Sequence, residues 1–126
     1  MKKIYKILDW DNQKQFKQVF TQDMVDKAIN KLSYPRLAPI IINKFPHFDS
    51  WIDIKNISHE ILYMWTDEYS WYAEIRILDN LFSGKLLLDL MNYQVEIRFS
   101  PVGTIDCENN IYNFITVVPI YNTINR

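Results

Sequence analysis

The sequence is poor in several residue types that define common functional classes. It contains only two glycines and one cysteine, Cys107, among 126 residues. A single cysteine excludes a disulfide framework, and nothing in the sequence argues for secretion. Phosphate-binding loops and dinucleotide fingerprints need several glycines at fixed spacing, which this chain lacks. These absences exclude disulfide-rich, P-loop and dinucleotide-binding proteins.

Charge and hydrophobic runs exclude further classes. The net charge is −1, so no basic excess exists to bind phosphates, and we expect no nucleic-acid partner. No stretch approaches the roughly 20 apolar residues of a membrane span, and the first residues lack an apolar segment of signal-peptide length. We therefore expect a soluble protein without membrane contact, made in a reducing compartment.

Metal and cofactor sites are not expected either. The chain has two histidines, His47 and His59, and neither C-x-x-C nor H-x-x-x-H spacing occurs. Hydrophobic residues make up 48% of the chain, which is enough for a packed core. With 126 residues, no repeat and no Pro/Gly/Ser-rich linker, the sequence predicts a single domain over residues 1–126.

Hydrophobic periodicity predicts two short helices and six to seven strands. One helix spans Gln22 to about Leu32, with Thr21 as its N-cap, and the other spans Gly84 to Met91, capped by Ser83. The predicted strands cover residues 2–8, 37–42, 51–57, 59–65, 71–78, 95–100 and 111–121. Strands 59–65 and 71–78 form a hairpin around the turn TDEYS. We expect an α+β fold with a mostly antiparallel sheet, curled or closed into a barrel.

Aromatic residues are concentrated around this hairpin. Trp71 alternates with Ala73, Ile75 and Ile77 on one face, which leaves Tyr72 on the other. The set formed by Trp51, Tyr63, Trp65, Trp71 and Tyr72 is typical of a buried core, or else of an exposed binding face.

One serine is a candidate nucleophile. In VEIRFSPVGTID the alternation places Ser100 on the wetter face of a strand that we expect to stop at Pro101. Such a serine is either an ordinary turn residue or a residue whose hydroxyl is positioned where a ligand can reach it. Serine becomes a nucleophile when an imidazole takes its proton and donors hold the oxyanion. His47 lies in the aromatic-flanked loop FPHFD, whereas His59 has the pattern of an edge-strand residue.

The order of these segments resembles a known family. From Phe20 to Asn122, the segments FTQDMVDKAINKL, FPHFD, ILYMWTDEYSWYAEIRIL, VEIRFSPVGTID and IYNFITVVPIYN are similar, in order and spacing, to tailed-phage prohead proteases, relatives of the herpesvirus assemblins. The resemblance implies a serine protease in which Ser100 attacks the peptide bond and His47 acts as general base. The backbone around Val102 and Gly103 would help to form the oxyanion hole. It also implies capsid and scaffold precursors as substrates, and a location in the host cytoplasm within the prohead or virion.

Two other functions remain open. Pro101 has no N–H, so it removes one potential oxyanion donor beside Ser100. The same fold then suits a non-enzymatic virion or capsid protein that binds partners through strand edges and aromatic surface. The third alternative is an unrelated small protein-binding module. Self-association into a homo-oligomer is compatible with all three.

Overall fold

The computed structural model describes residues 2–11, 13, 20–40, 54–93, 95–106 and 108–122. Within these residues the chain forms two α-helices and six strands, which confirms the predicted α+β class. The elements, in chain order, are β1 (Lys2–Asp9), α1 (Gln22–Ile29), β2 (Arg36–Pro39), the 3-10 helix η2 (Ile54–Asn56), β3 (Ile57–Thr66), β4 (Ser70–Ile77), α2 (Phe82–Asn92), β5 (Glu96–Asp106) and β6 (Ile111–Asn122).

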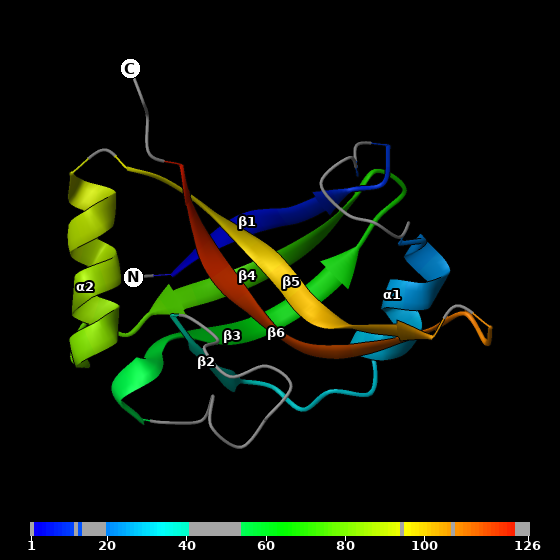
Figure 1. Ribbon diagram of the computed structural model, residues 1–126, viewed down its shortest axis with the longest axis horizontal. Coiled ribbons are helices and arrows are strands. Elements are labelled where there is room, and N and C mark those ends of the chain that lie inside the picture. Colours follow the sequence, from blue (N-terminus) through cyan, green and yellow to red (C-terminus); the bar gives the residue numbers. More distant parts are fainter. Residues whose placement is uncertain are drawn as a thin grey trace.

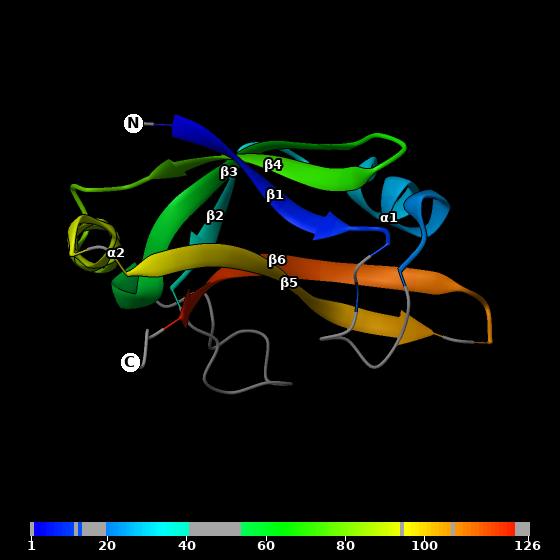
Figure 2. The same cartoon turned by 90° about the horizontal axis from the view of Figure 1, so that it is seen from above.

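The described strands form two antiparallel sheets. One has four strands in the order β1-β4-β3-β2, and the other is the two-stranded ribbon β5-β6. Both sheets are curled and lie one over the other, with α1 and α2 at opposite ends of the molecule (Figures 1 and 2). Of the two predicted alternatives, the described part of the chain therefore adopts curled sheets and not a closed barrel.

The β3–β4 hairpin was predictable from local pattern. Trp71, Ala73, Ile75 and Ile77 are all buried, whereas Tyr72, Glu74 and Arg76 lie on the opposite face, as the alternation predicts. The turn is closed by Asp67, whose carboxylate accepts hydrogen bonds from the backbone N–H groups of Tyr69 and Ser70, both at 2.8 Å. This Asp-based turn explains how the chain reverses here without a glycine.

Helix α1 confirms its predicted cap and buried face but is shorter than predicted. The Thr21 hydroxyl accepts a hydrogen bond from the N–H of Met24 at 3.2 Å. Met24, Val25, Ala28 and Ile29 are buried, and the helix ends at Ile29 instead of near Leu32. The N–H of Leu32 instead bonds to the carbonyl of Ile29, so the last predicted turn tightens into the following loop.

The predicted capping role of Ser83 is wrong. Helix α2 begins at Phe82, its N-cap is Leu81, and no side chain caps it. Ser83 is buried inside the first turn, where its hydroxyl donates a hydrogen bond to the backbone carbonyl of Lys55. A buried hydroxyl needs a partner, and η2 supplies one across the helix–sheet junction. The strand predicted over 51–57 is also wrong over Ile54–Asn56, which form η2, whereas Ile57 begins β3.

Strand β5 does not stop at Pro101, which corrects another prediction. It continues to Asp106, with Pro101 opposite Val117 in the ribbon. Among the described residues β5 pairs on one side only, with β6. A proline nitrogen on the free side of an edge strand removes no ladder hydrogen bond, so Pro101 is tolerated. Ser100 consequently lies within a paired strand, opposite Val118, and not at a strand-to-turn junction.

The core fills the space between the two sheets and the two helices. Its largest fully buried side chains include Trp71, Phe99, Ile61, Met64 and Leu87. Around Trp71, the rings of Phe20, Tyr112 and Phe114 pack at centroid distances of 6.5, 6.1 and 6.1 Å. These contacts join β4 to β6 and so hold the ribbon against the four-stranded sheet.

Gly103 permits a close approach within the ribbon. A Cβ at this position would lie 2.3 Å from the carbonyl oxygen of Asn113 and 2.8 Å from a ring carbon of Tyr112. We expect Gly103→Ala to lower the free energy of unfolding by about 2 kcal/mol, because the Tyr112 ring is buried and cannot move away freely. Urea denaturation measures this loss. Thr104→Ala, at the exposed next residue, should cost less than about 1 kcal/mol; equal losses would contradict the steric explanation.

Candidate functional site

Of the predicted catalytic residues, the structure describes Ser100 but not His47, which lies outside the described residues. The pairing of Ser100 with His47 therefore stays a prediction. Val102 and Gly103 lie in β5, opposite Thr116 and Phe114, with a bulge between the two positions. Their backbone belongs to a paired strand and not to the turn from which an oxyanion hole was expected.

His59 is not the edge-strand residue that the sequence suggested. It lies in β3, an inner strand of the four-stranded sheet, and is 0% exposed. Its Nε2 is 2.9 Å from the carbonyl oxygen of Val117, and its Nδ1 is 2.7 Å from the hydroxyl of Ser58. Because a carbonyl only accepts, Nε2 carries the proton and Nδ1 accepts from Ser58. Both ring nitrogens are therefore occupied within the core.

Burial also fixes the charge of His59. Loss of solvation lowers the pKa of this histidine from its ordinary 6.5 to about 4, although the hydrogen bond to Val117 acts in the opposite direction. The ring packs against Phe99, with centroids 4.9 Å apart. His59 is thus a neutral residue that joins β3 to the ribbon, and it is not exposed to a substrate.

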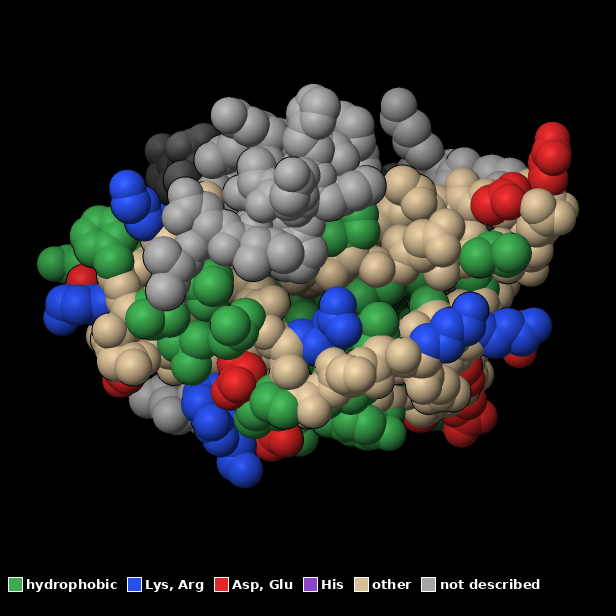
Figure 3. Space-filling view, turned by 90° about the horizontal axis from the view of Figure 1, so that it is seen from below, with side chains coloured by type: hydrophobic (Ala, Val, Ile, Leu, Met, Phe, Trp, Pro, Cys, Tyr) green, Lys and Arg blue, Asp and Glu red, His purple; other side chains and the backbone are tan. Residues whose placement is uncertain are grey.

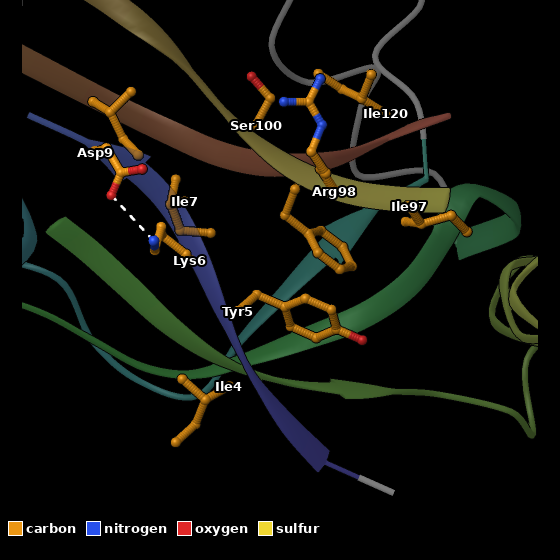
Figure 4. Close-up of a pocket in the computed structure, with 11 residues that line it drawn as sticks. Ile4, Tyr5, Lys6, Ile7, Asp9, Ile97, Arg98, Ser100 and Ile120 are labelled. Carbon is orange, nitrogen blue, oxygen red and sulfur yellow. Dashed lines mark ion pairs between the residues drawn. The ribbon is translucent and has the colours of Figure 1, made fainter. Parts of the chain in front are cut away.

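Ser100 lines a groove between the outer edges of β1 and β5. Its volume is about 480 Å³ (Figure 4). In the floor, Tyr5 of β1 meets Phe99 of β5 edge-to-face, with ring centroids 4.7 Å apart. Among the described residues, no strand pairs with the outer edge of either β1 or β5. The groove therefore combines an apolar, aromatic floor with two unpaired strand edges.

The β1 side of the groove carries a satisfied ion pair. The ammonium of Lys6 lies 3.2 Å from the carboxylate of Asp9. The Ser70 hydroxyl donates to the same carboxylate at 2.5 Å and, together with Lys6, holds the pKa of Asp9 below its ordinary value. Asp9 is therefore ionised at neutral pH and already partnered, so its charge is largely neutralised within β1.

The β5 side carries a cation without such a partner. Arg98 is exposed, and no ion pair joins it to another residue in the part of the chain that the structure describes. It lies on the same face of β5 as Ser100, beside Ile120 of β6 (Figure 4). A guanidinium and a hydroxyl two residues apart can together bind a carboxylate, since both donate hydrogen bonds and the guanidinium also carries a positive charge.

Sequence reasoning missed Arg98 and the groove for different reasons. The alternation Val95 to Ser100 already places Arg98 and Ser100 on one face, so that signal was available. The meeting of Tyr5 with Phe99 was not available, because no local pattern reports contacts between opposite ends of the chain.

The aromatic set of the hairpin divides between core and surface. Trp71 is buried, whereas Tyr63, Trp65 and Tyr72 lie on the outer face of the four-stranded sheet. Tyr63 and Trp65 are nearly parallel, at 17° and 6.2 Å between centroids, and Trp65 and Tyr72 at 23° and 5.8 Å. Trp71 therefore belongs to the core, the other three lie on the outer face, where a binding role stays a prediction, and Trp51 lies outside the described residues.

Comparison with protein-family models, curated proteins and solved structures finds no match to this chain. Neither helix of the described residues has the length and apolar character needed to cross a membrane. Within the same residues, no group of three or more His, Cys, Asp or Glu side chains is arranged to hold a metal ion. The groove and its charges are accordingly the basis for assigning a function.

Proposed function

We propose that this protein is a non-catalytic binding module that holds an extended, acidic peptide segment of a protein partner in the β1–β5 groove. The observation that carries the proposal is Arg98, a guanidinium with no ion-pair partner among the described residues, at the rim of a groove between two strand edges that no other described strand pairs with. Extended peptides commonly bind along such edges, with side-chain pockets supplying specificity.

The groove suits a peptide better than a compact ligand. It follows β1 from Ile4 to Asp9 and β5 from Ile97 to Ser100, so its walls are strand-like along their length. The floor of Tyr5 and Phe99 offers apolar surface to alternate side chains of the segment. β1 contains no proline, so its outer backbone groups are free to pair with the segment.

A binding role also agrees with the chemistry of the described histidine. Hydrolysis at Ser100 needs a base, and His59 is buried with both nitrogens hydrogen-bonded. Binding needs only the groove and its charge. If the resemblance of the sequence to phage proteins extends to partners, the peptide would belong to a capsid or scaffold protein.

The second candidate function is the prohead-type serine protease, favoured by the position of Ser100 in the wall of the groove. There Ser100 would attack a bound peptide, His47 would take its proton, and the backbone near Val102 and Gly103 would face the oxyanion. Incubation with a fluorophosphonate probe separates the two functions. The binding module predicts no labelling that depends on Ser100, whereas labelling lost in Ser100→Ala would establish the protease.

Panning a phage-displayed random peptide library tests the binding function directly. We expect the wild-type chain to enrich peptides with Asp or Glu, and Arg98→Glu to bind those peptides at least about tenfold more weakly, because a charge-assisted hydrogen bond becomes a repulsion. Lys31→Glu makes the same charge change just after α1, away from the groove lining, and should bind as wild type does. No enrichment, or equal binding by all three chains, would overturn the proposal.

A further inference from the structure

Helix α2 presents an apolar stripe that the fold leaves uncovered. Phe82 and Tyr93 are each 81% exposed and Leu86 is 44% exposed. At 100° per residue these positions and Asp89 fall on one side of the helix, opposite the buried residues Ser83, Gly84 and Leu87. Hydrophobic side chains are visible at the α2 end of the molecule, among Lys and Arg side chains (Figure 3). We call Phe82, Leu86, Asp89 and Tyr93 the α2 stripe.

Two charged side chains on α2, Asp89 in the stripe and Lys85 beside it, have no ion-pair partner within the described chain. Lys85 and Asp89 are spaced i,i+4, yet no ion pair joins them, whereas the Asp23–Lys27 pair of α1 closes at 3.2 Å. The order explains the difference, because an acid that precedes its base by four residues pairs better along a helix than the reverse order. Lys85 and Asp89 both lie toward the same flank of the stripe.

We propose that the α2 stripe is the interface of a twofold homodimer, in which α2 packs antiparallel against α2 of a second copy. With the axis between Leu87 and Leu88, Phe82 lies level with Tyr93 of the second copy, and Leu86 with Asp89. On the shared flank, Lys85 of each chain then lies within about one residue of Asp89 of the other. The aromatic ends of the stripe thus lie against each other, and the charges on its flank are complementary across the twofold axis.

The strand edges offer no comparable surface for self-association. In the described sheets, Pro39 in β2, Pro101 in β5 and Pro119 in β6 interrupt three of the four edges, and the lysines of the fourth, β1, repel a second copy of the same edge, although they would attract an acidic peptide. Proline and lysine are the usual features that prevent edge-to-edge pairing of sheets. The exposed apolar surface of α2 carries no such protection, which favours the helix as the contact between copies. This inference is independent of the peptide-binding function.

Sedimentation equilibrium of the full chain over a range of concentrations tests the dimer. We expect the wild-type chain to dimerise, and Phe82→Glu to sediment as a monomer. Tyr69→Glu, in the β3–β4 turn, is the matched control, because Tyr69 is also largely exposed, at 67%, and should dimerise normally. Since Phe82 is 81% exposed, its substitution should leave folding unaffected, as far-UV circular dichroism would verify.

Charge reversal distinguishes this geometry from non-specific hydrophobic association. Lys85→Glu and Asp89→Lys should each weaken the dimer by about fivefold, because each substitution breaks both symmetry-related rim ion pairs. The double variant Lys85→Glu/Asp89→Lys restores opposite charges across the interface and should dimerise more strongly than either single variant, but less strongly than wild type, because its acid-first order also allows an i,i+4 pair within the helix. A monomeric wild-type chain, equal effects of Phe82→Glu and Tyr69→Glu, or a double variant weaker than either single one would overturn the proposal.

Discussion

Gly84→Ala is expected to lower the free energy of unfolding by about 3 kcal/mol, at the upper end of the usual cost of overpacking a core. A Cβ on Gly84 would lie 1.8 Å from the carbonyl oxygen of Leu78 and 2.9 Å from that of Ser58. Both atoms belong to the backbone, and the N–H of Leu78 is hydrogen-bonded to the Ser58 carbonyl at 3.0 Å. To relieve these close contacts, the whole of helix α2 would therefore have to move away from the sheet.

Chemical denaturation at neutral pH measures this loss. Asn92→Ala is the control, because Asn92 is the exposed last residue of the same helix and its replacement should change stability by less than about 0.5 kcal/mol. In an exposed helix, alanine is more favourable than glycine by roughly 1 kcal/mol. A stabilised Gly84→Ala variant would therefore show that α2 does not pack against Leu78 as described.

Acidification from pH 6.5 to 4 is expected to destabilise the protein through His59. The folded pKa is about 4, whereas the unfolded chain has the ordinary value of 6.5. Above pH 6.5 both states hold a neutral imidazole, so the stability is fully present. Between these values the unfolded state binds the extra proton, and stability falls by about 1.4 kcal/mol per pH unit, roughly 3 kcal/mol in all. Below pH 4 this contribution no longer changes.

The slope belongs to His59 because its described neighbours carry no charge. Ser58, Val117 and Phe99 surround the ring, and none of them titrates in this range. The measurement is urea denaturation at several pH values in a His47→Gln background, which removes the other histidine. His59→Gln keeps an amide donor for Val117 but cannot be protonated, so its stability should be nearly constant between about pH 5 and 6.5, above the range in which carboxylates such as Asp9 titrate. An identical dependence of stability on pH in both chains would show that a group other than His59 causes the loss.

The parts of the fold predicted correctly are those set by local chemistry. The Thr21 cap, the buried face of α1 and the β3–β4 hairpin each follow from side chains within a few residues of one another. The last strand was also predicted, over 111–121, because β-branched and aromatic residues dominate it. Such signals do not depend on which elements later become neighbours.

The incorrect predictions depended on tertiary position. Pro101 ends a strand only if its nitrogen faces a partner, and the sequence does not report that β5 lies at an edge. His59 has the same local pattern whether it lies at an edge or in the core; its burial follows from the ribbon, through Val117. Ser83 has the local pattern of an N-cap, but its actual partner is the carbonyl of Lys55, which is distant in the sequence.

The candidate site was only half accessible to sequence reasoning, for the same reason. Ser100 was singled out from its alternation with Phe99, and it does line the groove. Its neighbours across the groove come from β1, at the other end of the chain, and the contact between Tyr5 and Phe99 needs the curled sheet. The sequence therefore indicates the Ser100 hydroxyl but not the groove surface around it.

A chemical-shift map tests the central claim most directly. The ¹⁵N-labelled chain would be titrated with the acidic peptide most enriched by panning, and the amide resonances followed. We predict that the largest shifts fall on β1 and β5, from Ile4 to Asp9 and from Ile97 to Ser100, and disappear in Arg98→Glu. Shifts concentrated on α2, or on the outer aromatic face around Trp65, would contradict the assignment of the groove as the binding site.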